Sequence, residues 1–186
     1  MRQPVDLPRA YRLLNHGPTV LVGASHEGRT NVMSVAWAMA LDFDPPKVAV
    51  VVDKSTYTRS LIEASGRLSI SVPCVAQAGL VTALGNHSGR DTDKLADFNV
   101  SLLDEPAAHG PLVAGCVAWL DGVCLPGADN AARHDLFLVE ITGAWADDRV
   151  FSNGRWHFEE AGDDSLRTLH HIAGGHYLAI GAPVDG

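Results

Sequence analysis

Short runs of apolar and β-branched residues, separated by turn-forming residues, dominate the first half of the chain. The run at 19–23 is followed by a turn-like sequence at 26–29 and a longer apolar stretch at 31–41, which together predict a β-hairpin. Side chains alternate between the two faces of a strand. One face of the second strand therefore carries Val32, Ser34, Ala36 and Ala38, and the other carries Met33, Val35, Trp37 and Met39. We expect the face with Trp37 to meet apolar surroundings.

A proline pair then ends this strand, and a strand and a helix follow. Asp44-Pro45-Pro46 stops the ladder because proline has no N–H to donate, and the apolar run 47–52 predicts the next strand. The segment 55–66 has hydroxyl side chains at its start and Gly66 at its end, which is typical of a short helix.

A second strand and helix are predicted directly afterwards. Leu68, Ile70 and Val72 alternate with Arg67, Ser69 and Ser71, which is the period of a half-buried strand. Apolar residues then recur at helical spacing between 75 and 85, and a polar loop follows at 86–94.

Later strands are predicted at 113–124 and 136–141, separated by a strong turn composition at 125–130. Strands that recur with turn signals, without regular alternation with helices, favour a closed or split antiparallel barrel over a doubly wound parallel sheet. We therefore expect a mainly β fold with short helices at its periphery.

Size and charge limit the classes of function. With 186 residues, 46% of them hydrophobic, the chain can bury one substantial core, so we expect a single domain over 1–186. A net charge of -8 gives no broad attraction to nucleic acid or anionic lipid. A small anionic ligand can still be held by local donors, since the nearest groups dominate the field inside a pocket.

The cysteines and the N-terminus indicate the compartment. Cys74, Cys116 and Cys124 form neither an even disulfide framework nor a CxxC pair, which favours reduced intracellular thiols. The first residues lack the apolar region of a signal peptide, and no later apolar run is long enough to cross a bilayer. We expect a soluble, cytoplasmic protein.

Five segments occur in this order along the chain: 31–37 (NVMSVAW), 43–50 (FDPPKVAV), 54–58 (KSTYT), 88–94 (SGRDTDK) and 174–177 (GGHY). Together they resemble the flavin reductase-like family of FMN-binding split barrels. The family includes flavoredoxins and the small reductase components of two-component monooxygenases. The resemblance implies an antiparallel Greek-key split β-barrel with short peripheral helices, a homodimer, and an FMN at each of two sites near the subunit interface.

The sequence departs from the family pattern around the strand that begins at Leu136. The family usually has Gly-Asp-His before this strand and Gly-Glu-Val within it, where this chain has Ala132-Arg133-His134 and 139–141 (VEI). Only His134 and Glu140 match. The wall of the site formed by this strand therefore differs from the pattern.

A bound FMN needs donors for its phosphate, and two segments offer them. The hydroxyls and free N–H groups at Ser55-Thr56-Tyr57-Thr58 start a predicted helix, where unsatisfied amides and the helix dipole both favour an anion. Capping of the helix by Ser55 or Thr56 is the alternative. Lys94 can add a point charge, with Ser88, Gly89 and Arg90 as further donors, although a solvated surface lysine is the common case.

The isoalloxazine ring needs a polar edge and one open face. The resemblance places Asn31 and the strand 33–37 beside the ribityl chain and ring, and Gly174-Gly175-His176-Tyr177 offers backbone that can approach closely. Trp37 is better suited to core or dimer packing than to redox chemistry. His134 is a possible donor to flavin or nicotinamide, but a lone histidine is more often structural.

The expected cofactor-binding residues are therefore Asn31, Met33, Ser34, Val35, Ala36, Trp37, Ser55, Thr56, Tyr57, Thr58, Ser88, Gly89, Arg90, Lys94, His134, Gly175 and Tyr177. We expect no dedicated catalytic residue, because hydride transfer to a flavin depends mainly on holding two rings together. A metal site built from His157, His170, His171 and His176 is disfavoured, since neither an HExxH nor a companion cysteine motif is present.

The resemblance implies an NAD(P)H-dependent flavin reductase that supplies reduced flavin to a partner, such as a monooxygenase or another electron-acceptor protein. A flavoredoxin-like electron carrier with tightly bound FMN and a non-catalytic flavin-binding protein share the same motifs. FMN is the expected flavin, and FAD is possible. The choice between NADH and NADPH stays open at this point.

Overall fold

The computed structural model describes residues 1–184 and 186, and most of the strands join one antiparallel sheet. Its strands are β1 (Arg2–Pro4), β2 (Val20–His26), β3 (Arg29–Val35), β4 (Ala38–Phe43), β5 (Pro46–Val51), β6 (Arg67–Val72), β7 (Ala118–Cys124) and β8 (Leu136–Asp147). Two short hairpins lie outside this sheet, formed by β9 (Phe151–Ser152) with β10 (Arg155–Trp156) and by β11 (Leu169–Ala173) with β12 (His176–Ala179).

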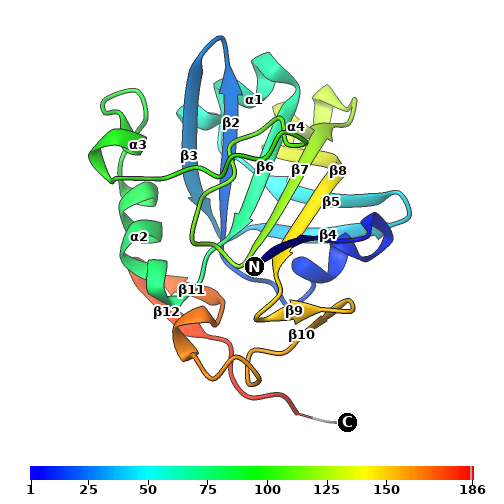
Figure 1. Cartoon of the computed structure of the whole chain (residues 1–186). Helices are drawn as coiled ribbons and strands as arrows, with labels where there is room; N and C mark the ends of the chain where they lie inside the picture. The colour runs from blue at the N-terminus through cyan, green and yellow to red at the C-terminus, as the bar shows by residue number, and fades with distance from the viewer. Residues whose placement is uncertain (185) are drawn as a thin grey trace.

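The helices are short and lie around the sheet (Figure 1). They are the α-helices α1 (Tyr57–Ser65), α2 (Ala78–Asn86), α3 (Lys94–Asp97) and α4 (Ala128–His134), and the 3-10 helices η1 (Leu7–Leu13), η2 (Val75–Gln77) and η3 (Asp164–Leu166). None of these helices, within the described residues, is long and apolar enough to cross a membrane.

The order of the strands forces the sheet to curl. The order is β3-β2-β6-β7-β8-β5-β4, with β1 added beside β8. The strands at the two ends, β3 and β4, are neighbours in sequence and are joined only by Ala36 and Trp37. Both edges must therefore meet at this link, and the sheet wraps into a barrel that is split between β3 and β4. The expectation of a mainly β, antiparallel split barrel is confirmed.

The predicted strand 31–41 is in fact two strands. The chain pairs with β2 as far as Val35, then bends at Ala36 and Trp37 and pairs with β5 from Ala38 onward. The Val51 amide donates to the Trp37 carbonyl at 3.0 Å, which fixes the bend. The alternation rule fails here, and Trp37 is 73% exposed instead of packing within the chain.

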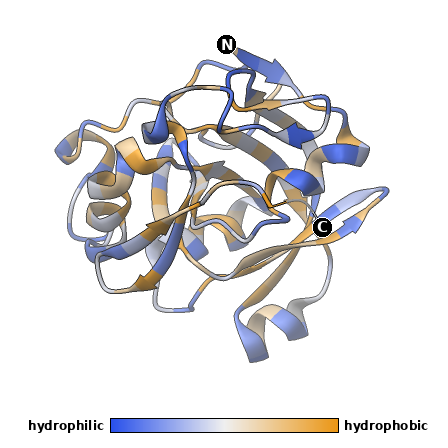
Figure 2. Ribbon diagram, turned by 90° about the horizontal axis from the view of Figure 1, so that it is seen from below, coloured by the Kyte–Doolittle hydropathy of each residue, from blue (hydrophilic) through white to orange (hydrophobic). Residues whose placement is uncertain are grey.

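Hydrophobic and hydrophilic stretches alternate along the strands (Figure 2), and the barrel interior is the main core. Leu68, Ile70 and Val72 point into it, as their alternation predicted. The half-buried description of this strand is wrong, however, because Ser69 and Ser71 are also buried. The segment around Pro111 covers them: the Ser69 hydroxyl donates to the Pro111 carbonyl at 2.6 Å.

The helix predicted at 55–66 is α1, and it ends where expected. Gly66 adopts a left-handed conformation with φ of 68°, which suits a residue without a Cβ. The helix packs against β2 and β3, and its buried residues Leu61 and Ile62 belong to the main core. The predicted helix at 75–85 divides into η2 and α2, and α2 also packs on β3 through Val81 and Leu84 (Figure 1).

Three of the elements predicted in the second half differ in the structure. The strand predicted at 113–124 begins only at Ala118, as β7, and Val113 instead forms an isolated bridge with Leu102. The second half of the turn predicted at 125–130 forms the beginning of helix α4. Alanines favour this helix, and Asp129 near its start and Arg133 near its end interact favourably with the helix dipole. The strand predicted at 136–141 continues to Asp147 and carries β1 on its far part.

Candidate functional site

Three adjoining pockets lie between β3, the start of α1, the end of α2 and the loop before α3. The first, the central pocket, has a volume of about 260 Å³. It is lined by Asn31, Met33, Ser34, Ser55, Thr56, Tyr57, Thr58, Leu84, Gly85, Asn86, His87, Ser88, Gly89 and Lys94. Most of these residues come from the segments that carried the sequence motifs.

The other two pockets adjoin the central pocket through different sets of residues. The hairpin pocket, about 290 Å³, shares Ser34, Gly85 and Asn86 with it and is completed by Thr19, Val35, Ala36, Val81, Thr82, His171, Gly174 and Tyr177. The arginine pocket, about 590 Å³, shares Asn31, Tyr57, Gly89 and Lys94 with it and is completed by Gly28, Arg29, Thr30, Arg90, Asp91, Thr92, Asp93 and Leu95. The three form one continuous surface for an elongated ligand.

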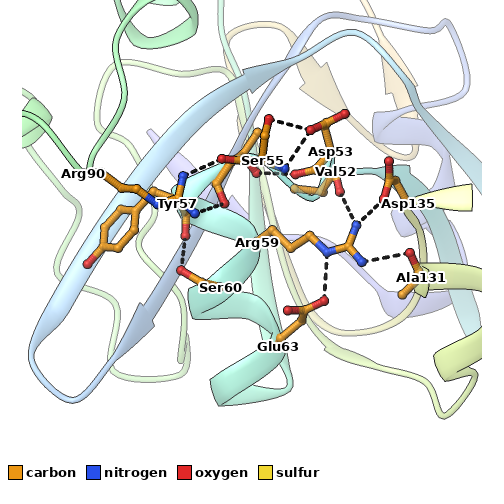
Figure 3. Close-up of polar contacts among 11 residues, drawn as sticks. Val52, Asp53, Ser55, Tyr57, Arg59, Ser60, Glu63, Arg90, Ala131 and Asp135 are labelled. Carbon is orange, nitrogen blue, oxygen red and sulfur yellow. Dashed lines mark hydrogen bonds and ion pairs between the residues drawn. The ribbon is translucent and has the colours of Figure 1, made fainter. Parts of the chain in front are cut away.

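The start of α1 lines the central pocket, and the amides of Ser55 and Thr56 just before it donate to Asp53. The Ser55 hydroxyl donates to the Asp53 carboxylate at 2.6 Å, and the Thr56 hydroxyl donates to the Asp53 carbonyl at 2.8 Å (Figure 3). The hydrogen bonds from Ser55 lower the pKa of the Asp53 carboxyl. Neither hydroxyl caps the helix, so the alternative of simple capping is not what the structure shows. The first amides of a helix have no intrahelical acceptor and attract an anion.

Arg90 fastens the loop before α3 to this helix start. Its guanidinium donates to the carbonyl of Ser55 and, at 3.4 Å, to that of Thr56, and it lies 5.9 Å from the centre of the Tyr57 ring (Figure 3). The Ser55 carbonyl precedes the N-cap residue Thr56 and is therefore free of the helical hydrogen-bond ladder. Arg90 thus holds the two walls of the central pocket at a fixed separation.

Arg59 anchors the same helix from its other side, and nothing in the sequence singled it out. The buried guanidinium donates to the Val52 carbonyl at 3.0 Å, to the Ala131 carbonyl at 2.8 Å, to the Glu63 carboxylate at 2.8 Å and to the Asp135 carboxylate (Figure 3). Val52 directly follows β5, Ala131 and Glu63 lie in α4 and α1, and Asp135 lies between α4 and β8. A buried charge is tolerated when it is fully paired in this way.

Lys94 is the most unusual residue of the central pocket. Its side chain is 3% exposed, and its ammonium donates to the Leu84 carbonyl at 2.7 Å. Burial lowers the pKa of this ammonium to about 8. No carboxylate among the described residues forms an ion pair with it. Since an ammonium has three N–H donors, Lys94 retains donors and charge for an anionic ligand.

Gly89 allows the loop to approach the barrel. A Cβ added at Gly89 would lie 2.7 Å from Cδ1 of Tyr57 and would also overlap the Asn31 amide. Asn31 is itself buried, and its amide donates to the Thr58 hydroxyl at 2.7 Å. The absence of a side chain at residue 89 therefore permits the contact between the loop, β3 and α1.

The hairpin pocket is bounded by the hairpin of β11 and β12. The Tyr177 hydroxyl lies 3.1 Å from the Thr82 hydroxyl, which links the hairpin to α2. The His171 ring lies 3.0 Å from the Gly174 carbonyl through Nε2, and the His171 amide donates to the Thr19 hydroxyl at 2.9 Å. These bonds attach a segment near the C-terminus to the wall of the site.

Most residues expected from the sequence line one of the three pockets, and Trp37, His134 and Gly175 do not. Trp37 points outward at the bend between β3 and β4. His134 is exposed at the end of α4. Gly175 lies next to Thr82, and a Cβ added there would be 3.4 Å from Cγ2 of Thr82. Groups that the sequence did not reveal are Thr19, Arg29, Val81, Thr82, Leu84, Asn86, His87 and His171. Helical spacing located α2 without showing which of its residues would face β3.

Histidines gather near the hairpin without forming a metal site. His170 packs against His16 with ring centres 5.7 Å apart, and His171 packs against Tyr177. Within the described part of the chain, no group of three or more His, Cys, Asp or Glu side chains is placed to hold a metal ion.

A curled antiparallel barrel with this row of pockets between α1, α2 and β3 defines a flavin reductase-like domain. The family model described as a flavin reductase like domain matches residues 12–163, and the chain belongs to this family.

Among its relatives, the crystal structure of an FMN-binding domain of a flavin reductases-like enzyme from Shewanella baltica OS155 is similar over 100% of this chain and 97% of that one, with a TM-score of 0.97 and 48% identity. The uncharacterized protein YddH of Escherichia coli K12 is 44% identical over 97% of this chain and 96% of its own length. The flavoredoxin of Desulfovibrio vulgaris (Miyazaki F) shares the fold, with a TM-score of 0.78 at 24% identity over 91% of this chain and 90% of that one.

Replacement of Gly89 by alanine tests the close packing of the loop. We expect Gly89→Ala to lower the free energy of unfolding by about 1–3 kcal/mol, because the new methyl group must displace Tyr57 and Asn31. Gly79→Ala in α2 is the control, since a Cβ there meets nothing within 4 Å and alanine favours a helix by roughly 0.5–1 kcal/mol. Urea denaturation of both variants measures the difference. Equal stability of the Gly89 variant and the wild type would contradict the packing described.

Proposed function

We propose that this chain binds FMN along the central and hairpin pockets and transfers hydride to it from NAD(P)H. The observation that carries the proposal is the buried ammonium of Lys94, which has no anionic partner in the described residues and lines the same pocket as the start of α1. The FMN-binding domain from Shewanella baltica, at 48% identity over the whole chain, supports FMN as the ligand.

The residues present fit FMN at both ends. Lys94, the amides at the start of α1 and the Ser88 side chain would hold the phosphate in the central pocket. Val35, Ala36 and Val81 give the hairpin pocket apolar wall, and Thr82, Asn86 and His171 add polar groups suited to the edge of the isoalloxazine ring. Ser34 lines both pockets and would lie along the ribityl chain between them.

Bound FMN would supply an acceptor for hydride from reduced nicotinamide and would pass the electrons to another molecule. The chain's own residues bind and orient: Lys94 and Arg90 keep the phosphate end fixed, and the hairpin with Tyr177 bounds the ring end. Positioning of this kind is what hydride transfer mainly requires. No side chain of this chain is assigned as a base. We further propose that a monooxygenase or another electron-acceptor protein takes the reduced flavin or its electrons.

We also propose a homodimer, because Trp37 and three residues of β4 form an exposed apolar stripe along this edge of the sheet. Trp37, Met39, Leu41 and Phe43 are 73%, 58%, 48% and 64% exposed, respectively. Large apolar side chains that are exposed close together are typical of an interface, and a two-fold axis would allow a second copy to cover this stripe with its own. Trp37 follows Ala36 of the hairpin pocket, so the partner subunit would lie near the proposed ring site.

The dimer has a direct test. We expect the wild type to have the mass of a dimer by light scattering, and the double variant Met39→Asp/Phe43→Asp to have that of a monomer, because each dimer would bury four new carboxylates. Val184→Asp is the control, since Val184 is 93% exposed and lies outside the stripe. A wild type that is monomeric at all concentrations and holds FMN stoichiometrically would exclude a site that depends on the dimer.

Lys94→Ala should weaken FMN more than riboflavin, because only FMN carries the phosphate. A hydrogen bond to a charged group contributes about 1.5–3 kcal/mol, or roughly 10- to 150-fold in the dissociation constant. The free protein loses the Lys94 proton near pH 8, whereas the phosphate favours the charged form, so FMN affinity should fall as the pH rises above about 8. Quenching of flavin fluorescence measures both ligands, with Lys47→Ala as the control. Equal weakening of FMN and riboflavin would refute phosphate contact.

Turnover separates the reductase from its alternatives. Purified protein is mixed anaerobically with NADH or NADPH and a large excess of FMN, and flavin absorbance is followed. A reductase whose flavin exchanges bleaches the whole excess. A carrier of the flavoredoxin type bleaches only the flavin bound to the protein. No bleaching with either nucleotide, in protein that binds FMN, would refute the reductase function and favour a carrier with another donor or a flavin-storage protein.

A further inference from the structure

A fourth pocket lies outside the proposed FMN site. This α4 pocket, about 360 Å³ in volume, is formed by α1, the end of β7, helix α4 and the start of β8. Arg59, Ile62, Glu63 and Gly66 of α1 recur at helical spacing and form one of its walls. None of the described residues that line it also lines the central, hairpin or arginine pocket. The proposed binding of FMN therefore neither fills this pocket nor needs it.

The α4 pocket exists because several of its residues have little or no side chain. Gly66, Gly127, Ala131 and Ala132 all line it. A Cβ added at Gly66 would meet no atom within 4 Å, and one added at Gly127 would meet only the Asn130 side chain, at 3.7 Å. The chain itself thus leaves this space unfilled.

The walls of the α4 pocket are mainly apolar. They include the side chains of Ile62, Leu125, Leu136, Phe137 and Leu138. The three leucines are half-buried, and none of these five residues is among the large apolar side chains that the described chain exposes at its surface. Their accessible area therefore faces a concavity, which suits a small molecule better than the flat surface of a protein partner. Its volume falls within the usual range for small-molecule sites.

Cys124 adds an uncharged thiol to the apolar wall. Burial raises the pKa of this thiol to about 11, so it is protonated at neutral pH and behaves as a small apolar side chain. Cys74 and Cys116 are fully buried, whereas Cys124 is only partly buried. Cys124 is therefore the cysteine that a reagent can reach through the pocket.

One end of the α4 pocket carries charges (Figure 3). The Arg59 guanidinium donates to the Glu63 carboxylate at 2.8 Å and to the Asp135 carboxylate. One cation thus faces two carboxylates, and a further anion would be repelled. Glu63 is 53% exposed, and within the described residues only its Oε1 accepts a hydrogen bond. Its second oxygen can accept one from a ligand.

We infer that the α4 pocket binds a small, mainly apolar molecule that has one hydrogen-bond donor and no negative charge, such as a simple phenol or an alcohol of similar size. The apolar part would lie against Leu136, Phe137 and Leu138, and the donor would reach Glu63. Flavin and nicotinamide nucleotides do not fit this description, because their phosphates would lie beside the two carboxylates. The α4 pocket is therefore a second ligand site, distinct from the proposed FMN site.

Two probes of the same shape test the chemistry of the site. Para-cresol has a hydroxyl donor, and para-toluate has a carboxylate in its place. Calorimetric titration measures the binding of each to the protein, with and without excess FMN. We expect para-cresol to bind with a dissociation constant of about 1 mM or below, unchanged by FMN, and para-toluate to bind roughly tenfold more weakly or worse. The outcome does not depend on whether the protein binds FMN.

Cys124 locates the bound probe. We expect para-cresol, at about ten times its dissociation constant, to slow alkylation of Cys124 by N-ethylmaleimide roughly tenfold in the wild type, as measured by peptide mass spectrometry. Cys124→Phe should fill the pocket and weaken para-cresol roughly tenfold or more. Leu102→Phe is the control, since Leu102 is 41% exposed and lies outside the pocket. The alkylation measurement in the wild type decides the matter if Cys124→Phe does not fold.

Several results would overturn the inference. They are a wild type that does not bind para-cresol, displacement of para-cresol by FMN, equal binding of para-toluate, and alkylation of Cys124 at the same rate with and without para-cresol. A folded Cys124→Phe variant that binds para-cresol as the wild type does would also overturn it.

Discussion

The two-residue link between β3 and β4 is the constraint on which the rest of this structure depends. Ala36 and Trp37 join strands at opposite ends of the sheet order, so the sheet must curl until its edges meet there. The curl places β3 where α1, α2 and α3 all pack against it. The same link turns Ala36 toward the hairpin pocket and leaves Trp37 at the surface. This two-residue link thus closes the barrel, contributes Ala36 to the wall of the site and begins the exposed apolar stripe at Trp37.

Within that frame, the site is held by charges that are already in place before a ligand arrives. Arg59 fixes α1 to β5 and α4, and Arg90 fixes the loop before α3 to the start of α1. Both arginines donate to protein acceptors, Arg59 restricting α1 and Arg90 the loop before α3, so less conformational freedom is lost when a ligand binds. Lys94 differs, because its single protein acceptor is a carbonyl. Arg59 and Arg90 therefore make the site rigid, whereas Lys94 supplies the positive charge available to a ligand.

The sequence revealed the parts whose signals are local. Alternating side chains located most strands, Gly66 ended α1, and the motif residues Ser55, Gly89 and Lys94 converged on one pocket. The misses depend on contacts distant in sequence. Ser69 is buried by the segment at Pro111, and the bend at Trp37 follows from the order of the strands in the sheet. The alternation of side chains along one strand predicts neither of these contacts. His134 was misplaced because residues before β8 form α4, after which Asp135, not His134, turns toward Arg59.

Burial of Lys94 has a consequence for how folding and binding are related. Removing an ammonium from water disfavours its charged form, and the lowered pKa of Lys94, about 8, reflects that cost in the protein without a ligand. The cost is not offset by a carboxylate, as it is for Arg59 with Asp135. A phosphate in the central pocket would offset it, and a ligand that binds only the folded chain stabilises that chain by mass action. An ammonium with a protein counterion would gain little from a ligand. Because Lys94 has no protein counterion, the empty protein is less stable, and an anion that binds beside Lys94 gains affinity by the same interaction.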